Sequence, residues 1–539
     1  MKSKNRLQAE VTENYLAGLD KSSPPSAADI EEELLTKINE ALELSNATMP
    51  KGRKARYLQD LTPAIIAAIM TWRYDIRLLS TSGMDSISDK DLLIIYQDSG
   101  PDAGTYTYNE GTLRKLARQY NGSMTTSDFR EIMSTLRDTA KRQSLCTDPD
   151  LIAVNNGIFN YRTKTLQPFD PDLVFLAKSR VNYQPNPVNP VIHNPDDNTD
   201  WDVETWMQEL SDDPEIVNLL WEILGAIIRP NVRWNKSAWF YSTIGNNGKG
   251  TLCELMRNLC GPGTYASIPL ANFGKEFMLE CLVRASAIIV DENDVGNYID
   301  NAANLKAIIT NDVIQMNRKF KTPISFQFRG FMVQCLNELP RVRDKSDSFY
   351  RRQLFVPFTK CFTGMERKYI KSDYLKRTDV LEYVLHKVLH MTYYSLSEPA
   401  ACKAGMDEYK MTNDPVRQFC EEILPQCQWD LLPFTFLYDL YKAWSGENNP
   451  SGRLQGKQGF IADVMNVLPD FPEWSCKDKK QQVRRKKLMD AAEPLIMTYD
   501  LNGWKNPHYN GGDPAKICSP VLSDTYRGLQ RSTSIQATP

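Results

Sequence analysis

The sequence has few histidines and no closely paired cysteines, and these absences argue against a zinc-binding module. Only four of its 539 residues are histidine, and its eleven cysteines include no C-x-x-C pair, the spacing on which small zinc sites usually depend. No run approaches the roughly 20 apolar residues that a membrane helix needs, and the start, MKSKNRLQAEVTENYL, has no apolar stretch after its charges. We therefore expect no membrane partner, a cytoplasmic location and reduced thiols.

A general excess of positive charge is also missing. Lysine and arginine together number 64 against 67 aspartates and glutamates, which leaves a formal net charge of -3. Proteins that bind nucleic acid through their overall field carry a strong positive balance, so any such contact here has to be local. The length exceeds that of one ordinary domain and predicts several.

Changes in the residue pattern predict a multidomain α/β protein with five regions. Apolar residues recur at helical spacing before residue 145, two β-prone runs follow at 151–169, and four prolines in QPNPVNPVIHNPDDN interrupt regular structure at 184–198. The regions are a mainly helical N-terminal region (1–145), a small β element with a proline-rich linker (146–200), a central domain with its leading helices (201–400), a small C-terminal domain (401–525) and a flexible tail (526–539).

A glycine-rich loop lies between a predicted strand and a predicted helix in TIGNNGKGTLCELMRNLCG, residues 243–261. Gly245 and Gly248 allow the backbone to turn its N–H groups toward a phosphate, and the helix N-terminus adds partial positive charge. Lys249 is placed to reach the outer phosphates of a nucleotide such as ATP. The candidate nucleotide-binding residues are Gly245, Asn246, Asn247, Gly248, Lys249, Gly250 and Thr251.

Two residues depart from the usual loop pattern G-x-x-x-x-G-K-[ST]. Thr243 occupies the first glycine position, and Gly250 stands where a hydroxyl residue normally follows the lysine. Thr251 is the nearest hydroxyl that could coordinate Mg2+, directly or through water. A glycine-lined loop that binds the metal more weakly stays open as the alternative.

Two further apolar runs end in polar residues that suit phosphate chemistry. ASAIIVDEND, 285–294, predicts a strand after which Asp291 holds Mg2+ and Glu292 polarises the attacking water. GFMVQCLNELP, 330–340, predicts a second strand after which Asn337 senses the terminal phosphate. The alternative for Asn337 is a cap of the turn before Pro340.

The segment SFYRRQLFVPF, 348–358, places two arginines before a β-prone run. In ring-shaped ATPases such an arginine enters the neighbouring subunit's site and offsets the charge of the transferred phosphoryl group. Arg352 is the first candidate and Arg351 the second, and a surface ion pair is the alternative for either.

Between the second and third motifs, two β-prone runs flank a basic and aromatic turn, which predicts a hairpin. Lysines at such a tip hold backbone phosphates while the aromatic ring meets a base or sugar, and a solvated turn is the alternative. The candidate DNA-binding residues are Arg318, Lys319, Phe320 and Lys321.

The order of TIGNNGKGT, IIVDEN, RKFK, QCLNELP and FYRRQLFVPF between residues 243 and 358 resembles superfamily 3 helicases. It is most similar to the phage and plasmid primase-helicases related to the poxvirus primase-helicase. In that family the matching segments are Walker A, Walker B, the DNA-binding loop, motif C and the arginine finger. Upstream, DLIAVNNGIFNYRTKTLQPF and the helices at 201–229 resemble the domain that precedes the motor, and 415–504 resembles the C-terminal winged-helix module.

The resemblance implies an AAA+-like P-loop ATPase core with a winged-helix-like C-terminal domain, assembled as a hexameric ring around single-stranded DNA. It also implies ATP and Mg2+ as cofactors, 3′ to 5′ translocation, and unwinding of forked DNA to replicate a phage, plasmid or other mobile element in its host's cytoplasm. Many relatives carry a primase domain with paired acidic residues and a histidine. The first 145 residues contain no histidine, so a separate primase or polymerase is an expected partner.

Two other functions stay open. The basic segment from Lys477 to Lys487 fits either a winged-helix face that grips duplex DNA or a solvated helix, and the first would suit an origin-binding initiator that unwinds little. Gly250 would suit a slow regulatory or assembly ATPase. The tryptophans assigned to packing, because of their spacing in amphipathic helices, are Trp201, Trp206, Trp221 and Trp234.

Overall fold

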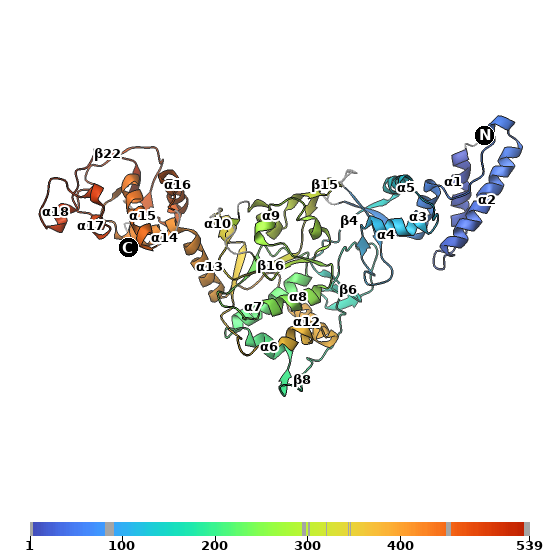
Figure 1. The fold of residues 1–539 in the computed structure, drawn as a ribbon, viewed down its shortest axis with the longest axis horizontal. Coiled ribbons are helices and arrows are strands. Elements are labelled where there is room, and N and C mark those ends of the chain that lie inside the picture. The colour runs from blue at the N-terminus through green and yellow to red at the C-terminus, as the bar shows by residue number, and fades with distance from the viewer. Residues whose placement is uncertain are drawn as a thin grey trace. The chain divides into compact units, whose positions relative to one another are not determined.

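The computed structural model describes residues 4–80, 91–293, 298–299, 302–319, 321–342, 344, 346–448 and 454–532. The chain is a mixed α/β protein of two compact units, Met1–Arg343 with Arg351–Lys403 and Asp344–Tyr350 with Ala404–Pro539 (Figure 1). Within the described parts of the chain, no helix combines the length and the apolar character needed to span a bilayer.

In its described residues, the N-terminal region combines five α-helices with a four-stranded sheet. Helix α2 begins at a capping box formed by Ser26 and Asp29, and its buried face repeats at helical spacing through Ile30, Leu34 and Ile38. The strand order is β3-β2-β1-β4, antiparallel except for the parallel β1–β4 pair. The elements are α1 (Lys4–Ala17), α2 (Ala27–Ala47), α3 (Pro63–Arg73), β1 (Ile76–Ser80), β2 (Leu92–Tyr96), β3 (Tyr106–Thr107), α4 (Glu110–Arg118), α5 (Thr126–Thr139) and β4 (Lys141–Ser144).

Residues 1–145 are mainly helical as expected, but the sequence did not predict this sheet. Strand β2 reads LLIIY, and four of its five residues are buried. A short apolar run of this kind fits a buried strand as well as a helix segment. Its ladder with β1, which pairs Ile76 with Ile95, satisfies the backbone groups and decides for the strand.

A small antiparallel sheet follows where the β element is expected. It consists of β5 (Leu151–Val154), β6 (Gly157–Asn160) and β7 (Thr165–Gln167). In the β6–β7 turn, Lys164 has a φ of 58°, and its Nζ donates hydrogen bonds of 2.7 and 2.8 Å to the carbonyls of Leu389 and Met391. The stretch expected as a linker contains the short hairpin β8 (Ile192–Asn194) and β9 (Thr199–Trp201).

The central domain is built on a five-stranded parallel sheet with the order β11-β12-β16-β10-β18. Strands β12 and β16 are buried along their whole length, as expected for a parallel sheet covered on both faces. The strands are β10 (Ser237–Tyr241), β11 (Tyr265–Ala266), β12 (Ala287–Val290), β16 (Phe331–Leu336) and β18 (Gln353–Pro357).

Helices α7 (Pro214–Ile228), α8 (Lys249–Cys260) and α12 (Thr378–His390) pack together against this sheet. In Figure 1, α8 and α12 lie on one side of β16 and α9 (Ala303–Ile309) on the other. The four tryptophans assigned to packing are all buried in the core shared by these elements. The remaining elements of this domain are α6 (Val203–Glu209), β13 (Tyr298–Ile299), β14 (Val313–Arg318), β15 (Lys321–Gln327), β17 (Arg341–Val342) and α11 (Lys368–Ser372).

Asp102 joins the N-terminal region to the central domain. Its carboxylate accepts a hydrogen bond from the Arg180 guanidinium and lies 3.2 Å from Nη2 of Arg284. Both arginines come from segments that flank the central sheet. An ion pair shared by two guanidinium groups and partly shielded from water holds the two regions in one unit.

The second unit has its own apolar core and a three-stranded antiparallel sheet with the order β19-β23-β20. Its elements are α10 (Asp347–Tyr350), α13 (Ala400–Asn413, which begins in the first unit), α14 (Pro415–Ile423), β19 (Leu431–Pro433), α15 (Phe434–Asn448), α16 (Lys457–Val467), β20 (Trp474–Ser475), β21 (Val483–Arg484), α17 (Leu495–Thr498), α18 (Pro514–Ile517), β22 (Thr525–Tyr526) and β23 (Gly528–Arg531).

Two expectations for this unit are corrected. The tail was expected to be flexible from residue 526, but β23 (Gly528–Arg531) is the central strand of the sheet, with Leu529 fully buried. The residues on either side of Leu529 are mostly polar, so the sequence shows no apolar pattern that would predict a strand here. The basic segment 477–487 is not a helix, because β21 within it pairs with β22.

Candidate functional site

The glycine-rich loop connects the end of β10 to the start of α8. Gly248 has a φ of 87° and caps the helix, and a Cβ at this position would come within 2.6 Å of the Leu210 side chain. Only glycine therefore fits without strain. Lys249 begins the helix and is 5% exposed, and burial lowers the pKa of its ammonium group below the ordinary value.

The segment after β18 braces this loop. The carbonyl of Asn246, which has a φ of 51°, accepts a 2.7 Å hydrogen bond from the Phe362 N–H. The Asn246 amide donates a 3.0 Å bond to Glu366, and the Asn247 carboxamide oxygen accepts a 3.3 Å bond from the Lys249 N–H. These hydrogen bonds fix the backbone conformation of the loop without a ligand. Phosphate binding by backbone N–H groups depends on such preorganisation.

Asp291 follows β12 and faces the first turn of α8. A Cβ built on Gly250 would lie 2.9 Å from Asp291 Oδ1 and 3.2 Å from Oδ2. Any larger residue at position 250 would have to displace the carboxylate. The departure from the usual loop pattern at Gly250 thus has a steric reason in this fold.

Two cations reach the same carboxylate. Nη1 of Arg257 lies 3.7 Å and Nζ of Lys371 lies 3.9 Å from Asp291 Oδ2. Lys249 adds a third positive charge on the same side of the sheet. A group with several negative charges is favoured where three cations converge. The sequence did not single out Arg257 or Lys371: Arg257 lies within the glycine-rich segment 243–261 but beyond its loop, and Lys371 lies outside all the motifs.

Asn293 holds the end of the segment ASAIIVDEND in place. Its amide donates 3.0 Å hydrogen bonds to the side-chain oxygen of Gln334 and to the Cys335 carbonyl, and its oxygen accepts a 2.8 Å bond from the Leu270 N–H. The turn after β12 is thereby tied to β16. Asn293 stands in the DEND motif but was not among the predicted site residues, because its partners lie more than 20 residues away in sequence.

The other predicted residues of the first three motifs lie at the edge of the sheet where the parallel strands end. Glu292 and Asn337 are exposed, and Thr251 is half-buried on α8. Asn337 directly follows β16, whose last residue, Leu336, accepts a hydrogen bond from the Ser242 N–H at the start of the loop. Parallel strands end at one edge of a sheet, so the structure brings Lys249, Asp291, Glu292 and Asn337 to that edge.

The two arginines lie elsewhere. Arg351 is exposed, Arg352 is half-buried, and both precede β18. The Arg352 carbonyl accepts a 2.8 Å hydrogen bond from Ser237, the first residue of β10. The glycine-rich loop begins only after β10, and a five-residue strand is about 16 Å long. Both arginines therefore start from the opposite edge of the sheet.

The predicted hairpin is formed by β14 and β15, with Arg318 opposite Lys321 and an irregular register after Met316. Lys319 is exposed in the turn. Phe320 and the side chain of Lys321 lie outside the described residues. The Arg318 guanidinium donates hydrogen bonds of 3.3 and 3.2 Å to the Thr322 carbonyl, so it braces the base of the turn.

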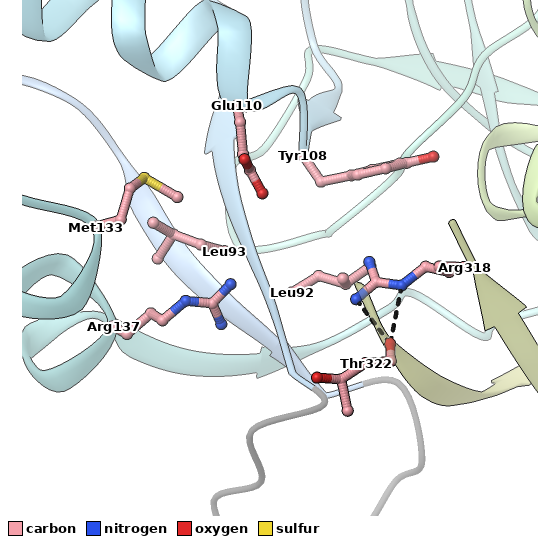
Figure 2. A pocket seen from close by; sticks show the side chains of 8 residues that line it. All are labelled: Leu92, Leu93, Tyr108, Glu110, Met133, Arg137, Arg318 and Thr322. Carbon is pink, nitrogen blue, oxygen red and sulfur yellow. Dashed lines mark hydrogen bonds between the residues drawn. The ribbon is translucent and has the colours of Figure 1, made fainter. Parts of the chain in front are cut away.

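A pocket of about 210 Å3 lies beside this base (Figure 2). Arg318 and Thr322 of the hairpin face residues of the N-terminal region across it, and Arg137 donates a 2.9 Å hydrogen bond to the Asp91 carbonyl at its border. The hairpin thus borders the N-terminal region. The lining residues are Leu92, Leu93, Tyr108, Glu110, Met133, Arg137, Arg318 and Thr322.

Known protein families match on both sides of the central domain and across it. Residues 48–213 match the family described as D5 N terminal like, and residues 411–493 match the family described as Poxvirus D5 protein-like. Residues 240–352, which contain the first three motifs, the hairpin and both arginines of the last motif, match a family of unknown function (DUF5906). No curated protein matches the chain.

Solved structures give weaker likenesses. Three structures of the NrS-1 C-terminal region are 13% identical, with TM-scores of 0.41 and 0.42, over 82% of this chain and 91 or 92% of theirs. A structure of the JCV helicase is 17% identical, with a TM-score of 0.25, over 39% of this chain and 59% of that one. TM-scores below 0.5 do not establish a common fold, so the relationship stands on the two D5-type sequence families.

Proposed function

Because this chain is related to the primase-helicases of the poxvirus D5 type, we propose that it is an ATP-dependent DNA helicase of superfamily 3 with an AAA+-like P-loop core. The observation that carries the proposal is the meeting of Lys249, Asp291 and Asn337 around a braced glycine-rich loop, at the carboxyl edge of a parallel sheet. This edge is where open α/β sheets bind nucleotides.

The residues at this edge fit ATP with Mg2+. The loop N–H groups and the Lys249 ammonium would hold the phosphates, and the positive charges of Arg257 and Lys371 would favour them further. Asp291 would hold the cation, with Thr251 contributing directly or through water. Bound Mg2+ neutralises charge that develops on the phosphates. Glu292 would orient and deprotonate the attacking water, and Asn337 would hydrogen-bond the terminal phosphate.

The position of the arginines supports assembly into a ring. Arg351 and Arg352 start about one strand length from their own chain's loop, beyond the reach of an arginine side chain. An arginine finger at this position would act on the site of a neighbouring subunit. We therefore propose a homo-oligomer, and a hexamer by analogy with the family.

The hairpin supports DNA as the substrate. The exposed Lys319 in the turn between β14 and β15 is suited to a backbone phosphate, and with Phe320 it would follow single-stranded DNA through the ring. We propose 3′ to 5′ translocation and the opening of forked DNA during replication of a phage, plasmid or other mobile element. A separate primase or polymerase would supply primers.

A second candidate is an origin-binding initiator with little unwinding. In the C-terminal unit, which we propose to be winged-helix-like, β21 and the residues after it line a surface hollow with Arg484, Lys486 and Lys487. Such a basic wing would grip duplex DNA. The slow regulatory ATPase loses its main support, because contact with Asp291 already explains Gly250.

The test is ATP hydrolysis with and without single-stranded DNA, run beside strand displacement on forks with a 3′ or a 5′ tail. We expect DNA to stimulate hydrolysis and displacement to need the 3′ tail. Lys249→Ala should reduce turnover by about 100-fold or more, whereas the exposed Lys275→Ala should not. ATP binding without stimulation or displacement would overturn the helicase, and tight binding of one duplex sequence would favour the initiator.

A further inference from the structure

Two buried cysteines lie next to each other beside Asp291 in the proposed ATPase site. Cys253 lies on α8, one turn after Lys249, and Cys335 lies on β16, two residues before Asn337. Their Sγ atoms are 3.4 Å apart, and the residues are 0% and 2% exposed. Neither thiol has a part in the proposed hydrolysis of ATP.

Asp291 completes a three-ligand cluster with this pair. One carboxylate oxygen of Asp291 and the two sulfur atoms all lie within 4.8 Å of one another. The side chain of Asp291 is 29% exposed, so solvent reaches the carboxylate side of the cluster while α8 and β16 bury the two thiols. Three donors from three elements therefore converge on one point with an accessible fourth direction.

The donor set selects for a soft cation. Two thiolates and one carboxylate suit Zn2+ or Cd2+ in tetrahedral geometry, whereas Mg2+ takes oxygen ligands in an octahedron. Zn–S bonds are about 2.3 Å long, so two sulfurs 3.4 Å apart need only a small opening to share an ion. A three-ligand site with one open position resembles exchangeable zinc sites more than closed structural ones.

We propose that Cys253, Cys335 and Asp291 form a binding site for a thiophilic divalent cation that competes with Mg2+ for Asp291. Binding would release one proton from each thiol, and water would take the fourth position. The inhibitory consequence rests on the proposed function. With its carboxylate bound between α8 and β16, Asp291 would no longer hold Mg2+, and ATP turnover would fall.

Binding can be measured without ATP, using Co2+ as a spectroscopic probe for Zn2+. The background is the full chain with Cys281→Ser and Cys361→Ser, because both of these thiols are exposed. We expect one Co2+ per chain, with the intense visible bands of tetrahedral cobalt and a sulfur charge-transfer band, all lost when Zn2+ displaces it. A weak octahedral spectrum without a sulfur band would overturn the proposal. This measurement requires no substitution in the buried core.

Matched variants then identify the ligands. Cys253→Ala and Cys335→Ala should each weaken Co2+ binding by about 100-fold. Cys260→Ala is the control, since Cys260 is equally buried on the same helix but lies outside the cluster. Unchanged binding in the first two variants, or equal loss in the third, would overturn the site.

The two proposals fail separately. If micromolar Zn2+ in excess Mg2+ inhibits ATP turnover in the background chain but not in Cys253→Ala, the inhibitory role is supported. A chain that hydrolyses ATP but gives no cobalt–thiolate spectrum overturns the metal site alone. A chain that shows the spectrum through both cysteines but does not hydrolyse ATP overturns the proposed function alone.

Discussion

The Asp291 carboxylate fills the space beside Gly250, since a Cβ on the glycine would lie 2.9 Å from the nearer carboxylate oxygen. Because Gly250 has no side chain, the Asp291 carboxylate can occupy the space that a Cβ would take. Turnover and stability should therefore respond in opposite directions to a side chain at this position.

Gly250→Ala should lower ATP turnover by roughly tenfold, because displacement of Asp291 by part of an ångström disturbs the geometry of the metal site. The same change should raise the free energy of unfolding by up to about 1 kcal/mol, because alanine favours the helix in which residue 250 lies. Steady-state kinetics over a Mg2+ titration and thermal unfolding measure the two effects. Unchanged turnover would mean that Asp291 does not hold the metal.

Arg352→Ala should abolish turnover and leave nucleotide binding nearly intact, because the arginine would act on the neighbouring subunit's site. An equal mixture of Arg352→Ala and Lys249→Ala subunits should recover activity, since about a quarter of the interfaces would pair an intact lysine with an intact arginine. The measurement is ATP hydrolysis after subunit exchange. Mixtures as inactive as either variant would argue against action between subunits, and Arg351→Ala serves as the comparison.

Lys319→Ala should reduce DNA-stimulated turnover several-fold and leave basal turnover almost unchanged, because this side chain lies in the β14–β15 turn and is not among the residues of the proposed nucleotide site. The slope of the logarithm of the DNA-binding constant against the logarithm of salt concentration should become shallower by about one for each Lys319–phosphate contact that is lost. Fluorescence anisotropy at several salt concentrations gives the slope. Equal losses of basal and stimulated turnover would mean that the hairpin supports the fold and not DNA binding.

Lys164→Met should lower the free energy of unfolding by about 1–2 kcal/mol at neutral pH, because two carbonyls at the end of α12 lose their donor. Burial, and then the neighbouring Arg229 guanidinium, lower the pKa of Lys164 to about 8 from an ordinary value of 10.5. Between these values the folded chain has released a proton that the unfolded chain still holds, so rising pH favours folding.

The stability advantage of the native chain over Lys164→Met should therefore grow between pH 8 and 10.5, as measured by denaturant unfolding at several pH values. The control is Lys376→Met, whose side chain is exposed and should show no such trend. A constant difference across this range would contradict the lowered pKa.

Much of the candidate site was predictable because it depends on local backbone rules. A glycine loop between a strand and a helix has few possible shapes, and the apolar strands that Asp291 and Asn337 follow bring these residues to one edge once the strands are parallel. The sequence also indicated the hairpin at 313–327 and the core role of Trp201 and its fellow tryptophans, because alternation and helical spacing are visible within a few residues.

The tertiary structure decided the rest, because it depends on partners that are distant in sequence. The N-terminal sheet needed the β1–β2 ladder to distinguish LLIIY from a helix, and β23 needed two partner strands to become the centre of a sheet.

The sequence alone therefore indicated Lys249, Asp291 and Asn337 as residues of the proposed nucleotide edge, since their chemistry follows from local pattern. Only the tertiary structure decided what surrounds them. The packing of α8 against β12 and β16 placed Gly250 beside Asp291 and Cys253 against Cys335. The pairing of β12 with β16 brought Asn293 to its partners on β16, and the parallel pairing of β18 with β10 started the arginines at the opposite edge, since contacts between elements follow from strand order and not from spacing along the chain.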